Sequence, residues 1–432
     1  MPAPTQTPPP TRLTRQLGVP SATLLGLGSI LGTGIFVSIG LAAELTGPSL
    51  LAAIGLAALL ATCNALSSAQ LAAAHPVSGG TYEYGYRLLH PNLGFLAGWM
   101  FLCAKTASAA TAAIGASAYG LALIGVSSDS IRSGLAGAIA LATMALVLSG
   151  LRRSSLINTI IVLLTITALL SLCVSVFIAA PSEASDRLMP VLPETDGWRD
   201  FFTATALMFV AYTGYGRIAT LGEEAREPRR TIPLAVIATL GLSAILYMVV
   251  SASALLAIGA DGLASSTSNG ATPLEAAAQA VGGTTLGRIL AIGAVTAMLG
   301  VLLNLILGLS RVVLAMGRRG DLPNLFSKLS SAAEPTAAIL LIGFSVSLLA
   351  LFGSVKMAWT FSALTVLIYY AITNLAALRL PKADKLYPAW ISWIGLMGCL
   401  SLTLFIPLNI WLAGFVLAII GFALRIFFQK KK

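Results

Sequence analysis

Charged residues are scarce in this chain: only 10% of its 432 residues are Asp, Glu, Lys or Arg, while 57% are hydrophobic. A soluble domain typically carries about 25% charged residues, so this chain has too few to cover a water-exposed surface. Uncharged stretches such as 16–43 and 231–260 exceed the roughly 20 apolar residues that cross a bilayer as a helix. The composition argues against a soluble enzyme, a nucleic-acid-binding protein and a disordered scaffold. It indicates a polytopic integral membrane protein surrounded by lipid.

Histidine and cysteine are also rare, with two and four residues respectively. The two histidines bracket one short loop, and no two cysteines have the spacing of a metal site. We therefore expect no metal and no cofactor. The cysteines lie within apolar stretches, where a thiol behaves as a small buried hydrophobe. The first 20 residues are rich in proline and hold two arginines, which is unlike the apolar segment of a signal peptide.

Apolar stretches bounded by charges, glycine and proline predict an all-α protein with twelve transmembrane helices. The expected spans are 21–44, 48–73, 94–124, 133–150, 155–180, 201–222, 232–257, 289–316, 337–353, 357–378, 388–407 and 409–428. Cytoplasmic loops of membrane proteins are enriched in Lys and Arg. If both termini are cytoplasmic, the loops on that side hold most of the 26 basic residues. The same bias explains the net charge of +10 without a nucleic-acid partner.

The first predicted span is interrupted by Gly26, Gly28, Gly32 and Gly34. A glycine costs about 1 kcal/mol relative to alanine in a helix interior, so this segment is a poor continuous helix. Two explanations remain. The glycines could let a neighbouring helix pack closely, or the segment could unwind and line a cavity with its free backbone groups.

The sixth predicted span favours unwinding, because its centre carries Gly214 and Gly216. Paired interruptions in corresponding positions of two halves point to a binding site between inverted repeats. The half-helix after Gly34 would direct its amides at an anion. Unwound carbonyls from Phe209 to Thr213 would accept hydrogen bonds from an ammonium group, so the two features together suit an α-amino acid.

A five-plus-five inverted repeat divides the chain into five parts. These are a cytoplasmic tail (1–20), a first repeat of helices 1 to 5 (21–180), a second repeat of helices 6 to 10 (201–380), helices 11 and 12 (386–428), and a basic cytoplasmic tail (429–432).

Four segments of the chain resemble the amino acid–polyamine–organocation transporters, and more narrowly the bacterial amino acid permeases. They are 28–36 (GSILGTGIF), 76–84 with 94–99 (PVSGGTYEY and GFLAGW), 211–224 with 228–233 (AYTGYGRIATLGEE and PRRTIP), and 310–323 (SRVVLAMGRRGDLP). Their order and spacing cover roughly residues 20 to 325.

This resemblance implies alternating access on a leucine-transporter-like fold, with helices 1 and 6 unwound. It implies that Gly32, Thr33 and Gly34 hold the substrate carboxylate. It also implies that the backbone of Ile30, Val210, Ala211 and Thr213 meets the amine and frames the side-chain pocket.

The family often has an aromatic gate where this chain has Val210, which suggests a roomier pocket or a gate supplied by Phe209 or Tyr212. Members that select cationic substrates tend to carry acids near positions 104 and 216, which are Ala104 and Gly216 here. We therefore expect neutral substrates.

Two charged residues fall inside predicted spans. Lys105 lies about three turns into the third span, where a lysine costs roughly 2.5 to 3.5 kcal/mol to insert. Its ammonium could extend to the cytoplasmic interface, or it could couple transport to protons. The family's proton-coupled members often carry a lysine in span five, where this chain has Thr165. Arg217 could pair with Glu223 or Glu224 as a gate, or contact substrate.

The sequence favours a secondary amino acid transporter of a prokaryotic inner membrane, taking up neutral amino acids with protons. Exchange, coupling to sodium, and transport of amines or inorganic ions on the same fold remain open. An intramembrane enzyme would need acids or histidines within its spans, and these are nearly absent. The light subunit of a disulfide-linked exchanger would carry a cysteine in the loop after span three. Residues 125–133 hold none, so we expect no disulfide-linked heavy subunit.

Overall fold

The protein is helical in the computed structural model. The structure describes residues 17–75, 79–126, 128–150, 155–179, 186–219, 225–270, 272–330 and 334–429. Within these ranges no β-strand forms, and the one extended contact is an isolated bridge between Leu17 and Ala225. The α-helices are α1 (Val19–Ile30), α2 (Thr33–Phe36), α3 (Ser38–Thr46), α4 (Leu50–Ala74), α5 (Thr81–Leu88), α6 (Pro91–Leu123), α7 (Asp129–Leu148), α8 (Ser155–Ala179), α9 (Trp198–Tyr212), α10 (Gly216–Ala219), α11 (Pro228–Gly270), α12 (Pro273–Arg319), α13 (Thr336–Phe352), α14 (Val355–Leu378), α15 (Ala389–Thr403) and α16 (Leu408–Gln429). Short 3₁₀ turns separate some of them, including η3 (Thr213–Tyr215) between α9 and α10.

Eight helical stretches of the described chain are long and apolar enough to cross a membrane, and three shorter apolar helices accompany them. Each of the twelve predicted spans contains helix, although the first and the sixth are divided into short pieces. The helix α5 lies in a loop between two predicted spans and is an addition to the expected set.

The two longest helices each bend at a glycine. Gly259 in α11 and Gly283 in α12 have φ values of 69° and 67°. A positive φ is sterically accessible to glycine but costly for residues with a Cβ, so each helix changes direction there. The helical piece on the far side of each bend lies outside the predicted spans 232–257 and 289–316.

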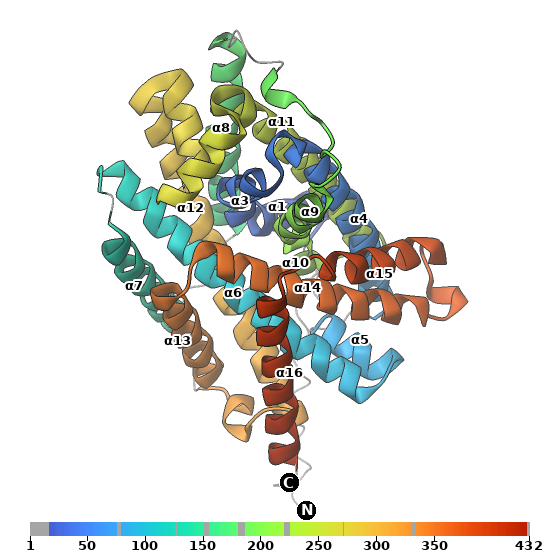
Figure 1. Cartoon of the computed structure of the whole chain (residues 1–432). Helices are drawn as coiled ribbons and strands as arrows, with labels where there is room; N and C mark the ends of the chain where they lie inside the picture. The colour runs from blue at the N-terminus through green and yellow to red at the C-terminus, as the bar shows by residue number, and fades with distance from the viewer. Residues whose placement is uncertain are drawn as a thin grey trace, which may run out of the picture.

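Burial divides the helices into an inner and an outer group. The helices α6 and α14 are mostly buried, whereas α7, α8 and α16 expose most of their apolar residues. Figure 1 shows the short pieces α1, α9 and α10 at the centre of the molecule, with α7 and α13 packed together at one edge and α15, which packs against α14, at another. An apolar face that is exposed outside the protein suits contact with lipid.

Candidate substrate site

The first predicted span breaks between α1 and α2. Leu31 has a ψ of 100° and Gly32 has extended backbone angles, φ −178° and ψ −128°. The Leu31 amide still donates to the Leu27 carbonyl. The helical hydrogen bonds of α2 begin with the Ile35 amide, which donates to the Gly32 carbonyl. The first amides of a helix have no partner within it, so this break presents backbone donors at the start of α2.

The sixth predicted span differs from the expectation of an unwound segment. It continues from α9 through η3 into α10, with Thr213 and Gly216 close to helical geometry. The Thr213 amide bonds to the Val210 carbonyl, so the segment tightens into a 3₁₀ turn that satisfies part of its backbone. The predicted unwinding from Phe209 to Thr213 is therefore wrong, because Phe209 to Tyr212 are helical and Thr213 begins the 3₁₀ turn.

Glycine allows the two interrupted segments to meet. A Cβ on Gly214 would lie 2.3 Å from the carbonyl oxygen of Ser29, and a Cβ on Gly34 would lie 2.6 Å from the Cβ of Ala211. Close backbone approach of this kind requires a residue without a side chain. The glycines thus serve contact between α1–α2 and α9–α10 as well as the break itself.

Tyr247 of α11 bridges the same two segments. Its hydroxyl donates to the carbonyl of Ile30 at 2.8 Å and lies 3.3 Å from the carbonyl of Ala211. A carbonyl oxygen has two lone pairs, so each of these acceptors retains capacity for a ligand. Tyr247 was missed from the sequence because it lies 217 residues from Ile30.

A cavity of about 210 Å³ lies beside the two segments. Its wall includes Ile30, Thr33, Gly34, Val210, Ala211 and Thr213, which are predicted substrate residues, together with Lys105 and Arg217. Gly32, Phe209 and Tyr212 do not line it. The rings of Phe209 and Tyr212 are fully buried in the protein, so neither is placed to act as an aromatic gate here.

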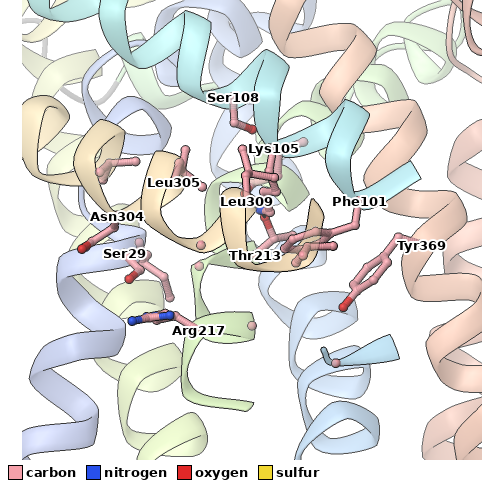
Figure 2. Close-up of a pocket in the computed structure, with 18 of the residues that line it drawn as sticks. Ser29, Phe101, Lys105, Ser108, Thr213, Arg217, Asn304, Leu305, Leu309 and Tyr369 are labelled. Atoms are coloured by element: carbon pink, nitrogen blue, oxygen red, sulfur yellow. Dashed lines mark hydrogen bonds between the residues drawn. The ribbon is translucent and has the colours of Figure 1, made fainter. Parts of the chain in front are cut away.

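Other wall residues are ones that the sequence did not connect to the site. Figure 2 shows Asn304, Leu305 and Leu309 of α12 along one side, with Phe101 of α6 and Tyr369 of α14 along another. Nothing in the hydropathy of these segments distinguishes cavity-facing residues from lipid-facing ones.

Lys105 points into the middle of the protein. Its ammonium donates to the hydroxyl of Thr213 at 2.7 Å, and the side chain is buried. Figure 2 shows it directly beside Thr213 at the cavity. Of the two orientations expected from the sequence, the structure has the inward one, and the ammonium does not extend to the interface.

Arg217 lies on the cavity wall at the start of α10. Its expected partners, Glu223 and Glu224, fall outside the described residues, so that pairing stays a prediction.

A buried polar cluster lies at the end of α12, around Asp321. The Asp321 carboxylate accepts from the guanidinium of Arg425 at 2.9 Å and from the hydroxyls of Tyr82 and Tyr86 at 2.7 and 2.6 Å. Burial, and then the bond to Asp321, raises the pKa of both tyrosines above the ordinary value, so they remain donors. Because Tyr82 also lines the cavity, this cluster fixes part of the cavity wall.

A second ion pair holds α5, the short helix that carries Tyr82 and Tyr86. Arg319, the last residue of α12, bonds to both carboxylate oxygens of Glu83 on α5. Its guanidinium also lies 4.1 Å from the ring centre of Tyr86. The helix α5 is therefore attached to α12 and α16 by charged contacts.

Comparison with known proteins gives a family match along most of the chain. Residues 17–428 match the family described as amino acid permease. An uncharacterized transporter of Mycobacterium tuberculosis is 36% identical over 415 residues, covering 96% of this chain and 91% of that protein. The branched-chain amino acid permease BcaP of Bacillus subtilis is 30% identical over 73% of this chain and 70% of its own length. A cationic amino acid transporter 4 of Mus musculus is 30% identical over 87% of this chain and 61% of its own length.

Proposed function

The chain belongs to the amino acid permease family, a family of multi-pass membrane transporters and not of enzymes, and from this premise we propose proton-coupled uptake of neutral amino acids by alternating access. In this proposal twelve helices span a prokaryotic inner membrane, with both termini in the cytoplasm. Helices 1 to 5 (21–180) and 6 to 10 (201–380) form the inverted repeats, and 386–428 supply the last two helices.

The observation that carries the proposal is the juxtaposition of backbone groups at the cavity. The amides at the start of α2, at Gly32, Thr33 and Gly34, would hold the substrate carboxylate; Thr33 and Gly34 line the cavity, and Gly32 directly precedes them. The carbonyls of Ile30 and Ala211 would accept from its amine through their second lone pairs. In addition, the hydroxyl of Thr33 is buried without a hydrogen-bond partner among the described residues, and a bound carboxylate would supply an acceptor.

The cavity also suits one side of an alternating-access cycle. It includes Arg311 and Tyr82, near loops that the positive charges assign to the cytoplasm. On the opposite side, the hydroxyl of Tyr119 donates to the carbonyl of Phe36 at 2.7 Å, and the Trp359 indole donates to the carbonyl of Leu207 at 3.0 Å. In this assignment, the conformation described faces the cytoplasm.

Proton coupling is assigned to Lys105. A lysine held within a span is costly as an ammonium, and the residue is placed where it contacts the 3₁₀ turn of the sixth segment. Gain or loss of its proton would change the interaction that holds Thr213. A coupled exchange of substrates and coupling to sodium are the alternatives to this part of the proposal.

The test is a thermal-shift screen of the detergent-solubilised protein against the twenty amino acids, their decarboxylated amines and simple salts. A ligand that binds only the folded state raises stability by about 2.7 kcal/mol at a hundredfold excess over its dissociation constant. We expect stabilisation by several neutral amino acids and none by the matching amines. A response to amines or salts alone would contradict amino acid recognition.

A further inference from the structure

The ionisable residues on the cavity wall have an unusual balance. Among the described residues that line it, none is an aspartate or glutamate, whereas Lys105 and Arg311 are cationic, as is Arg217, which interacts with another group of the protein. A cavity lined by one sign of charge concentrates ligands of the opposite sign. The wall therefore favours a ligand that brings negative charge.

The Lys105 ammonium has hydrogen-bonding capacity left over. It carries three donors, and its one hydrogen bond to a described residue goes to the Thr213 hydroxyl. That hydroxyl uses its own proton to bond the Val210 carbonyl at 2.7 Å, so it acts only as an acceptor toward Lys105. A buried ammonium is stable when it is paired with an opposite charge, and the described protein supplies none.

The surroundings of Lys105 form a distinct corner of the cavity. Ser108 lies three residues further along α6, which places it on the same helix face, and its hydroxyl lies 2.8 Å from that of Ser362 on α14. Phe101 lies four residues earlier, and Leu309 of α12 closes the corner (Figure 2). The corner thus combines one cation and a hydroxyl with apolar walls.

Resting on the proposed amino acid site, we infer that Lys105, in its protonated form, binds a carboxylate on the substrate side chain. The substrate range proposed above then widens: beside neutral amino acids the site accepts aspartate and glutamate, and it prefers these two to their amides. The α-carboxylate and amine occupy the backbone groups of α2, Ile30 and Ala211, while the side-chain carboxylate lies between Lys105 and Ser108. Ala104 and Gly216 agree with this assignment, because the lack of acids at those positions disfavours cationic side chains and places no restriction on anionic ones.

The experiment compares glutamate with glutamine and aspartate with asparagine, as inhibitors of labelled alanine uptake into alanine-loaded proteoliposomes at equal pH on both sides. The proteins are the unaltered chain, Lys105→Met and Lys105→Arg. We expect glutamate to inhibit the unaltered transporter at least tenfold more strongly than glutamine. Lys105→Met should remove or reverse that ratio while retaining glutamine inhibition, and Lys105→Arg should restore a preference for glutamate.

Lys356→Met is the matched control, because it removes the same charge from an exposed lysine that pairs with Glu44, outside the cavity wall. It should leave the ratio unchanged. Equal inhibition by glutamate and glutamine in the unaltered protein would overturn the inference, and so would an equal loss of both in Lys105→Met. If neutral amino acids inhibit and acidic ones do not, only this inference fails. If no amino acid inhibits, the proposed function fails as well.

Discussion

Lys105 is costly in free energy to place within the membrane, and it lies at the cavity. The lysine lies inside a predicted span, and the structure brings its ammonium to Thr213, 108 residues away. Such intramembrane ionisable residues commonly mark ion or proton pathways. The coupling role that we propose makes a prediction separate from substrate selection.

We expect Lys105→Ala to abolish uptake driven by a pH gradient in proteoliposomes, because no titratable group would remain at that point of the wall. Exchange of internal for external neutral amino acid without a gradient should continue, and this serves as the control for folding. The measurement is labelled amino acid accumulation with and without an imposed gradient. Undiminished accumulation in the variant would remove Lys105 from the coupling mechanism.

Gly214 makes a prediction of a steric kind. The carbonyl oxygen of Ser29 lies where a Cβ on residue 214 would be. The Gly214→Ala substitution must therefore push η3 away from α1. Overpacking typically costs about 1 to 3 kcal/mol, and we expect both a lower thermal midpoint and weaker substrate binding. Gly216→Ala is the control, because a Cβ there meets only the Tyr370 hydroxyl at 3.4 Å. Equal effects of the two substitutions would contradict the close-approach explanation.

At the scale of elements, α5 is held against α12 and α16 by the Asp321 cluster. Breaking a buried ion pair by removing one partner costs roughly 3 to 5 kcal/mol, because the other charge stays buried. Asp321 and Arg425 are both almost fully buried. We therefore expect Arg425→Met to destabilise the solubilised protein by about 3 kcal/mol, measured by thermal or denaturant unfolding followed through tryptophan fluorescence.

The double variant Arg425→Met with Asp321→Asn should recover part of that loss, since it removes the uncompensated carboxylate. Arg229→Met tests the same change at an exposed pair with Asp384, where surface ion pairs contribute about 0 to 1 kcal/mol. If Arg425→Met is no more destabilising than Arg229→Met, the cluster does not hold α5 in place.

At the scale of the whole molecule, the distribution of basic residues predicts orientation. The four cysteines lie in apolar segments and can be replaced by alanine, after which single cysteines report on each side. In right-side-out vesicles we expect a membrane-impermeant maleimide to label Ser130→Cys and to spare Ser330→Cys. Both serines are exposed, so permeabilisation should make both react. The opposite labelling pattern would reverse the assigned topology.

Hydropathy and charge predicted much of the helical arrangement, because an apolar stretch in lipid must satisfy its backbone within itself. The break in the first span also falls inside its predicted glycine-rich segment, since several glycines weaken a helix locally. The sixth span shows the limit of the same argument. Its glycines form a 3₁₀ turn and a close contact with α1 instead of an unwound segment. Which of these two structures forms depends on the neighbouring segments that pack against the glycines.

The sequence by itself determined the class of protein, the apolar helices, the first interruption and the family, because each follows from local composition or from motifs read along the chain. Only the tertiary structure decided which residues form the cavity wall, that Tyr247 bridges the two interrupted segments, that Lys105 meets Thr213, and that Asp321 meets Arg425. Each contact joins two residues that are between 36 and 217 positions apart in the sequence. Helices that are apolar on every side carry no periodic signal for the face that turns inward, so packing alone makes that choice.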